Sequence, residues 1–179
     1  KAFIQAAMAD ANINYYISSS ESDFKAHLRS QNYTVVVLMH TSHVLGLPSG
    51  FSVSMSSELR AMVSQGLGLV AVSNQISLFD IWEDVYGLRD SRADVKARRF
   101  ILNDELLGSF DLELNGLASR VYTASDAVGL GEFKVDCLTI FHCREIREGN
   151  YPGLVDHYYG EGRVMTSSYD LAEASPVDD

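Results

Sequence analysis

The sequence predicts an α/β domain built on a doubly wound, mostly parallel sheet with helices on both faces and a C-terminal β-hairpin. Two continuous apolar runs, residues 33–39 and 69–73, are typical of strands that are buried on both faces. Segments with helical periodicity alternate with these runs, as right-handed crossover connections require. Near the end of the chain, Gly160-Glu161-Gly162 separates two strand-like segments and favours a tight hairpin turn.

The first half of the chain supplies the alternating elements. Ser20 is the expected N-cap of the second helix, because its hydroxyl can accept from an unpaired amide, and Asp23 stands where a capping box has an acid. Gly66 is a helix-ending glycine just before the second apolar run. In order, we expect a helix at 2–11, a strand at 13–18, a helix at 20–31, a strand at 33–39, a loop at 40–54, a helix at 56–65, a strand at 69–73 and a helix at 78–88.

The second half is less regular, and residues 89–135 are predicted to be an insert in the domain. Its charged stretch, residues 89–99, is expected to be a surface loop or a short helix, whereas residues 119–123 look like an edge strand. Beyond the insert, we expect strands at 137–142 and 153–159, a turn at 149–153, and a last strand at 163–169 that pairs back across the hairpin. Residues 172–179 are acidic and read as a linker or tail, so the domain spans residues 1–171.

Composition excludes several classes of function. The chain has 179 residues and a formal net charge of -10, a field that repels nucleic acid and anionic membrane surfaces. No apolar run approaches the roughly 20 residues of a membrane span. Two cysteines are too few for a disulfide framework or a zinc site of cysteines alone. Few lysines and abundant Ser, Asn and Tyr favour an exported bacterial protein, although two thiols do not support that compartment.

Candidate site residues follow the predicted parallel strands, because ligands of such sheets collect at the carboxyl ends of the strands. A serine nucleophile, Ser73, with His40 or His43 as base would make a hydrolase, but Ser73 lacks the small flanking residues of a nucleophile elbow. Two histidines three residues apart could share a metal, yet no acidic or cysteine ligand is near them, so we predict neither a metal nor a cofactor. The candidates are His40, Ser73, His43 and His142 for catalysis, and Thr41, Ser42, Asn74 and Gln75 for ligand binding.

Three stretches resemble the class I glutamine amidotransferase-like superfamily, in its non-amidotransferase, trehalose-utilisation-type or embedded bacterial domains. They are residues 24–39, with the run Tyr33-Thr34-Val35-Val36-Val37-Leu38, residues 59–70, and residues 152–171 with the turn Gly160-Glu161-Gly162-Arg163-Val164. The resemblance implies a flavodoxin-like sheet whose first strand is missing before Lys1. It also implies a cysteine in the elbow after residues 69–73, where this chain has none. Since thiolate attack needs that cysteine beside an imidazole, glutaminase activity is not expected.

Two functions remain open. The first is a non-catalytic, amidotransferase-like structural or interaction module of a larger bacterial protein, whose partners are the other domains of that chain. The alternative is a carbohydrate- or small-molecule-binding domain, or a hydrolase, that uses the loops at the carboxyl edge of the sheet. A cluster of His40 or His43 with Ser73 beside a concave pocket would favour the alternative. A space filled by Phe51 or Trp82 would favour the module.

Overall fold

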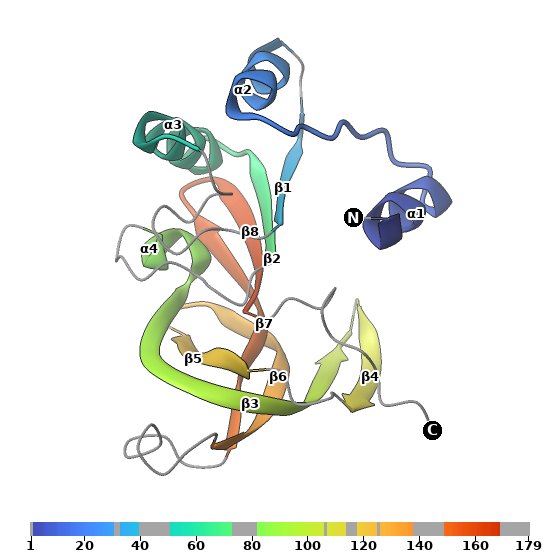
Figure 1. Cartoon of the computed structure of the whole chain (residues 1–179), viewed down its shortest axis with the longest axis vertical. Helices are drawn as coiled ribbons and strands as arrows, with labels where there is room; N and C mark the ends of the chain where they lie inside the picture. The colour runs from blue at the N-terminus through green and yellow to red at the C-terminus, as the bar shows by residue number, and fades with distance from the viewer. Residues whose placement is uncertain are drawn as a thin grey trace.

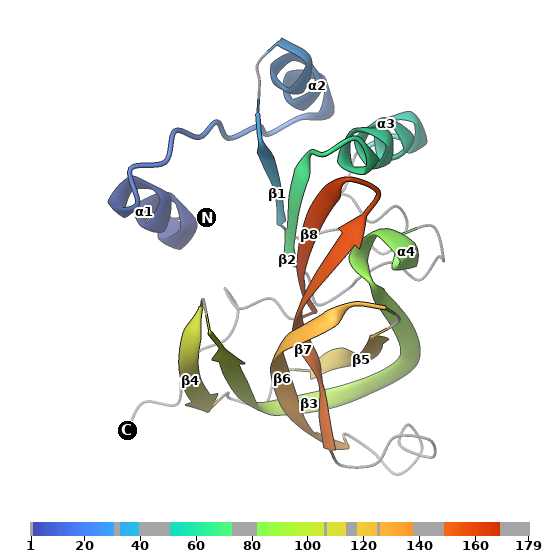
Figure 2. The same cartoon turned by 180° about the vertical axis from the view of Figure 1, so that it is seen from behind.

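The chain has two halves that share one eight-stranded sheet, as a computed structural model shows (Figures 1 and 2). One half holds helices and parallel strands, and the other is antiparallel. The structure describes residues 2–30, 33–39, 51–72, 82–105, 107–113, 118–124, 126–137 and 149–168. The helices are α1 (Ala2–Asp10), α2 (Glu21–Ser30), α3 (Val53–Ser64) and α4 (Glu83–Tyr86). The strands are β1 (Val35–Met39), β2 (Gly68–Val72), β3 (Leu88–Asp104), β4 (Gly108–Glu113), β5 (Ala118–Ala124), β6 (Val128–Cys137), β7 (Gly149–Tyr159) and β8 (Gly162–Ser167).

The strand order is β1-β2-β8-β7-β6-β3-β4, with β5 paired to β3. β1 pairs with β2 and β2 with β8 in parallel, whereas every other pairing among the described strands is antiparallel. The mostly parallel, doubly wound sheet predicted from the sequence is therefore wrong, and the architecture is a mixed α/β sheet in which antiparallel pairs dominate. The predicted C-terminal hairpin is confirmed, since β7 and β8 pair antiparallel around Gly160 and Glu161.

One face of the parallel strands is covered by helices. We call this the covered face; its residues are Val36, Leu38, Leu69, Ala71, Val164 and Thr166. Leu28 of α2, three apolar residues of α3 and two of α4 pack in the same core. Each buried Val or Leu side chain on this face contributes about 1.5–3 kcal/mol relative to an exposed one. The hydrophobic effect therefore fixes these three helices on this side of the sheet.

The opposite face of the same strands is only partly covered. We call this the open face; its residues are Val35, Val37, Val70, Val72 and Met165. Val35 is 48% exposed, and the other four are partly exposed. Burial alternates along β1 and β2, so the prediction that both apolar runs are buried on both faces is wrong. The one described helix on this side is α1, which Figures 1 and 2 show across β1 from α2 and α3.

Residues 89–135 are not an irregular insert but most of the antiparallel half. The charged stretch 89–99 lies inside β3, a 17-residue strand that pairs with β4, β5 and β6. Register shifts mark bulges between Asp90 and Asp94 and between Ala97 and Arg99, and bulges let a long strand bend. Figure 1 shows β3 as a curved ribbon around the lower half. The predicted edge strand at 119–123 is confirmed as β5.

Several element boundaries differ from those predicted. Residues 13–18 are extended but belong to no sheet, and β7 begins at Gly149, where we expected a turn. The predicted helix at 78–88 is described only as α4, because Gly87 takes a left-handed φ of 65° that ends the helix and β3 starts one residue later. The N-cap at Ser20 is confirmed, since the amide of Asp23 donates to its hydroxyl at 3.3 Å. The helix predicted at 56–65 begins earlier, at Val53, and residues 40–50 of the predicted loop lie outside the described residues.

The tip of the β7–β8 hairpin closes the covered face. Its Glu161 amide donates to the Ser64 carbonyl at the end of α3, at 3.0 Å. A Cβ added to Gly162 would lie 2.1 Å from the Val63 carbonyl oxygen, so only glycine allows this approach. The hairpin tip and the last turn of α3 are thus locked together by backbone contacts.

Candidate functional site

The three parallel strands end at one edge of the sheet. Met39 of β1 lies opposite Val72 of β2, and Val72 lies opposite Ser167 of β8. In sheets of this kind, ligands bind outside the carboxyl ends of the strands. This carboxyl edge is therefore the candidate site that the topology defines.

Three buried polar residues mark the end of β8 at this edge: Thr166, Ser167 and Ser168. The Ser168 hydroxyl donates to the Pro152 carbonyl at 2.9 Å, and its amide donates to the Gly153 carbonyl at 2.9 Å. These bonds tie the end of β8 to β7, which makes Ser168 a structural residue. The Thr166 hydroxyl is fully buried and has no hydrogen-bond partner among the residues that the structure describes. An unsatisfied buried hydroxyl costs about 1–3 kcal/mol.

The N-terminus of α3, which follows the carboxyl end of β1 in the chain, already holds a carboxylate. Ser52 caps the helix by accepting from the Met55 amide at 3.3 Å. Glu21 of α2 accepts hydrogen bonds from the Ser52 amide and from the Ser52 hydroxyl, the latter at 2.6 Å, and pairs with Lys25. The ammonium of Lys25 and the Ser52 hydroxyl lower the pKa of Glu21 to about 2. This helix end therefore binds an anion from its own chain.

The space beneath α3 on the covered face is filled by aromatic side chains. Trp82 is fully buried, donates from its indole Nε1 to the Ser56 hydroxyl at 2.8 Å, and stacks on Tyr86 with ring centroids 5.1 Å apart. Burial raises the pKa of the Tyr86 hydroxyl. Phe51 packs edge-on against Phe24 of α2 at 5.4 Å. This packing belongs to the core of the covered face; the surroundings of His40, His43 and Ser73, which would decide between the two functions, lie outside the described residues.

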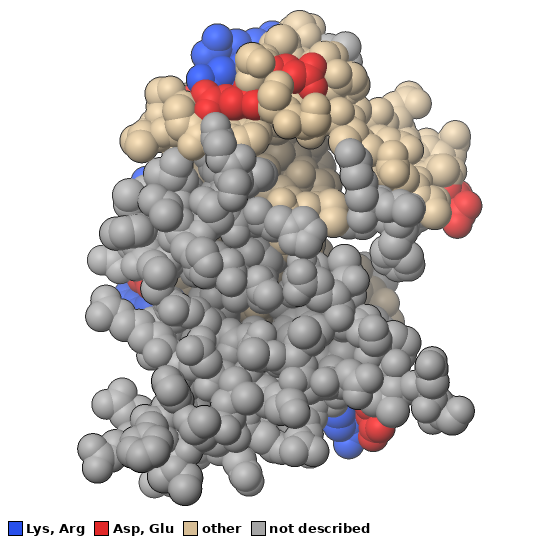
Figure 3. All heavy atoms as spheres, in the orientation of Figure 1, with Lys and Arg blue, Asp and Glu red and all other residues tan. Residues whose placement is uncertain are grey.

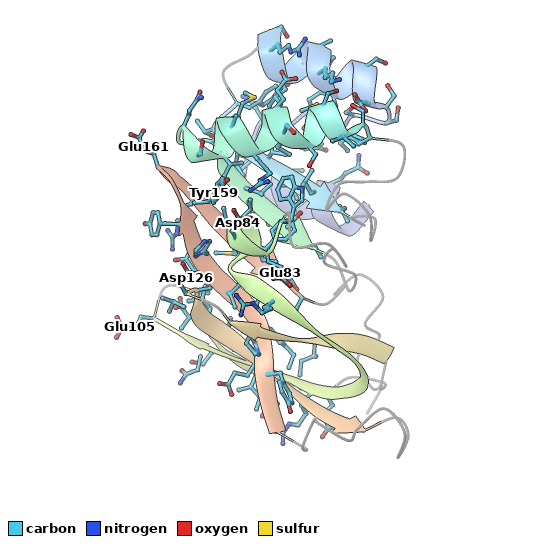
Figure 4. The ribbon with its side chains drawn as sticks, turned by 90° about the vertical axis from the view of Figure 1, so that its left-hand side faces the viewer. Glu83, Asp84, Glu105, Asp126, Tyr159 and Glu161 are labelled. Atoms are coloured by element: carbon cyan, nitrogen blue, oxygen red, sulfur yellow. The ribbon has the colours of Figure 1, made fainter. Side chains whose placement is uncertain are left out.

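A polar cluster joins the two halves on the flank of the sheet. Arg60 of α3 donates to both carboxylate oxygens of Asp84, at 2.9 and 3.2 Å, and to the Tyr159 hydroxyl at 3.2 Å. His157 of β7 is 7% exposed and donates from Nε2 to the Asp84 carbonyl at 2.8 Å. Asp126 lies 3.7 Å from Nδ1 of the same ring. Figure 4 shows Asp84, Asp126 and Tyr159 on this flank, contributed by different segments. The bonds fasten α3, α4 and β7 to one another, which is a structural role.

All the site residues predicted from the sequence lie outside the described residues: His40, Thr41, Ser42, His43, Ser73, Asn74, Gln75 and His142. The structure therefore tests only the elements before them. His40 is the next residue in the chain after β1, and Ser73 is the next after β2. Because β1 and β2 are parallel and in register, their last residues, Met39 and Val72, lie at the same edge of the sheet; the placement of the segments that follow stays a prediction.

Sequence reasoning missed the contribution of β8. The hairpin signal predicted only its antiparallel pairing with β7, and nothing local shows that its other side pairs parallel with β2. The run Thr166-Ser167-Ser168 was a usable signal, because three small hydroxyl residues at the end of an apolar strand are expected at a polar edge.

Two further features, a metal-ligand cluster and a membrane-spanning helix, are absent from the described part of the chain. Within residues 2–168, less the gaps given above, no group of three His, Cys, Asp or Glu side chains could hold a metal ion. Among the same residues, no helix is long and apolar enough to cross a membrane.

Comparison with known proteins gives structural likenesses alone. No family model and no curated protein matches the sequence. The chain is similar to the β-galactosidase from Bacillus circulans sp. alkalophilus, with 17% identity and a TM-score of 0.53 over 80% of this chain and 20% of that one. It is also similar to the β-galactosidase from Rahnella sp. R3, with 14% identity and a TM-score of 0.52 over 82% of this chain and 21% of that one. At such identities the likeness shows the fold alone, and the chain spans about a fifth of each enzyme.

Proposed function

We propose that this chain is a carbohydrate-binding domain of a larger carbohydrate-active protein, with the sugar bound at the carboxyl edge of β1, β2 and β8. The observation that carries the proposal is the likeness of 80–82% of this chain to about a fifth of two β-galactosidases. A fold that occupies a small part of such enzymes is suited to an accessory role. Other domains of the parent chain are its expected partners.

The edge has the chemistry that a neutral sugar requires. Sugar hydroxyls both donate and accept hydrogen bonds, and Ser, Thr, Asn, Gln and neutral His can do the same. The residues that follow β1 and β2 in the chain, His40 to His43 and Ser73 to Gln75, are of these types. Ser167, which lies opposite Val72, brings the end of β8 to the same edge.

The proposal assigns binding and not hydrolysis to this chain. Glycoside hydrolysis uses two carboxylates about 5–9.5 Å apart across the bond that breaks. Residues 40–43 and 73–75, which directly follow β1 and β2 in the chain, contain no Asp or Glu. The serine nucleophile that remained open, Ser73 with His40, is part of the sugar-binding set in this proposal.

Two experiments on the 179-residue chain test the proposal. Isothermal titration calorimetry measures binding of galactose, lactose and mannose, and p-nitrophenyl β-galactoside serves as the substrate in an assay for hydrolysis. We expect one sugar to bind in the millimolar range, no release of nitrophenol, and at least tenfold weaker binding by the variants His40→Ala and Ser73→Ala. Ser57→Ala, on the exposed surface of α3, is the matched control and should bind as the parent does. Equal binding by Ser73→Ala and Ser57→Ala would contradict this placement of the site.

A second candidate is the non-catalytic interaction module, which the half-exposed Val35 and the partly exposed apolar open face favour. We also propose kinship with the amidotransferase-like superfamily. Two of the stretches that carry the resemblance fall on α2–β1 and on α3–β2, and the third falls on β7–β8. Because the chain has no cysteine directly after residues 69–73, where the family has its nucleophile, we expect no release of ammonia from glutamine in a coupled glutamate assay. Measurable glutaminase activity would contradict that prediction.

A further inference from the structure

Helix α1 is apolar, and its described side chains, Gln5, Ala6, Met8, Ala9 and Asp10, are not part of the buried core. Seven of its nine residues are apolar, and they surround the helix on all sides. A helix that is apolar all round is normally buried. None of its described side chains is buried, since Ala6, Ala9 and Asp10 are exposed and Gln5 and Met8 are only partly covered. A nine-residue helix is also too short to persist in water without a packing partner.

The open face of the sheet is likewise apolar and incompletely buried. All-parallel sheets occur almost only with both faces covered, and the parallel part of this mixed sheet, β1, β2 and β8, has one face that is only partly covered. Val37 of β1, Val70 of β2 and Met165 of β8 stand in one row across the three strands, and all three are partly exposed. Val35, one step along β1, is 48% exposed. This row is an apolar strip of about the width that one helix covers.

The segment between α1 and α2 is tethered so that α1 lies on the side of the open face. Tyr16 stacks on His27 of α2 with ring centroids 3.5 Å apart, and its hydroxyl donates to Asp23 at 2.9 Å. The linker then passes the outer edge of β1, as both ribbon views show (Figures 1 and 2). The free part is residues 11–15, which reach about 17 Å when extended. Ile13 and Tyr15 of this part are 54% and 41% exposed.

We propose that the open face is the docking site of α1 of the same chain, and that α1 with its linker is a strap that closes over β1, β2 and β8. A short flexible tether gives the helix an effective concentration in the millimolar range at its own sheet, so its own α1 outcompetes that of a second copy. Closure covers the strip of the sheet that is also the surface favoured for an interaction module. The strap therefore controls access to that surface.

Disulfide trapping in the 179-residue chain tests the strap, in a background with Cys137→Ser and Cys143→Ser. The test pairs are Met8→Cys with Val35→Cys and Met8→Cys with Val70→Cys; the control pair is Met8→Cys with Ala61→Cys, on the exposed surface of α3. Val35 is already half exposed, so its replacement leaves the fold intact even if that of Val70 does not.

We expect at least one test pair to form an intramolecular disulfide at least tenfold faster than the control pair. The products are separated from disulfide-linked dimers by non-reducing electrophoresis, and the emission of the buried Trp82 reports that each variant is folded. Equal rates in the test and control pairs would overturn the proposal. Faster formation of dimers than of the internal bond would also overturn it, because the occupant would then be a second copy.

Discussion

The covered and open faces of the parallel strands are both mainly apolar but have different surroundings. Val36 and Leu69 point into a core of three helices, whereas Val35 and Val70 are their neighbours in the chain and point the other way. An apolar run in the sequence therefore predicts a β-strand, but it does not predict whether one or both faces of that strand are buried. Stability should therefore depend on one face, and binding of partners on the other face or on the edge between them.

The largest expected effect is the difference in unfolding free energy between a truncated side chain on the covered face and one on the open face. Leu69→Ala should lower the free energy of unfolding by about 2–5 kcal/mol, because it leaves a cavity beneath the helices. Val70→Ala, the matched control on the next residue, should cost less than about 1 kcal/mol because its side chain is already partly exposed. Urea unfolding followed by Trp82 emission measures both. Equal costs would mean that the open face is as well packed as the covered face.

The hairpin tip should be the next most sensitive point of the covered face. Gly162→Ala places a methyl group 2.1 Å from the Val63 carbonyl oxygen, so α3 or the hairpin must shift. We expect a loss of about 1–3 kcal/mol in unfolding free energy, typical of overpacking. Gly129→Ala is the control, because nothing lies within 4 Å of its added methyl group. A loss in Gly162→Ala no greater than in Gly129→Ala would show that the tip is not locked to α3.

The hydrogen bond between Trp82 and Ser56 gives a smaller and more specific effect. Ser56→Ala leaves the buried indole N–H without this acceptor, which should cost about 1–2 kcal/mol. Trp82 is the single tryptophan of the chain, so its emission spectrum reports the change directly. Ser57→Ala, on the exposed side of the same helix, should leave both the stability and the spectrum unchanged. The opposite ranking of these variants would exclude Ser56 as the indole's acceptor.

The contact between Glu21 and Ser52 should give the smallest effect, and one that depends on pH. The pKa of Glu21 is about 2 in the folded chain and near 4.3 in an unfolded one, so its contribution is complete above about pH 4.3 and is lost as the pH falls through about 2. The melting temperature of Glu21→Gln should lie below that of the parent at pH 6 and converge with it toward pH 2. The acidic and basic side chains stand side by side over the helices (Figure 3). A difference that persists unchanged at pH 2 would contradict this origin.

The parallel half could be predicted from the sequence because its signals are local. Apolar runs, the Ser20 cap and the hairpin glycines each depend on a few neighbouring residues. The antiparallel half could not, because β3 alternates charges such as Arg89 and Lys96 with few apolar residues, and its stability comes from pairing with three strands that are distant in sequence. Strand propensity is set by such cross-strand neighbours more than by the residue itself.

In the candidate site, too, some features have local sequence signals and others depend on pairing with a strand that is distant in the sequence. The sequence predicts that the segments after two parallel strands lie near each other, and the structure shows that the strands themselves, β1 and β2, end at the same edge of the sheet. The third strand at this edge, β8, pairs with β2 although the two strands are far apart in the sequence, and this pairing is seen only in the structure. Residues such as Ser167 join a site through pairing with a distant strand, which no local pattern records.

The central claim is that a sugar binds at the carboxyl edge, and amide chemical shifts during a galactose titration test it most directly. In a two-dimensional NMR spectrum of the labelled chain, we expect saturable shifts at Thr166, Ser167 and Ser168 together with the residues that follow β1 and β2. Val35 and Met165 of the open face should remain unchanged. Shifts confined to the open face, or none at the end of β8 when the sugar has saturated its site, would contradict the account.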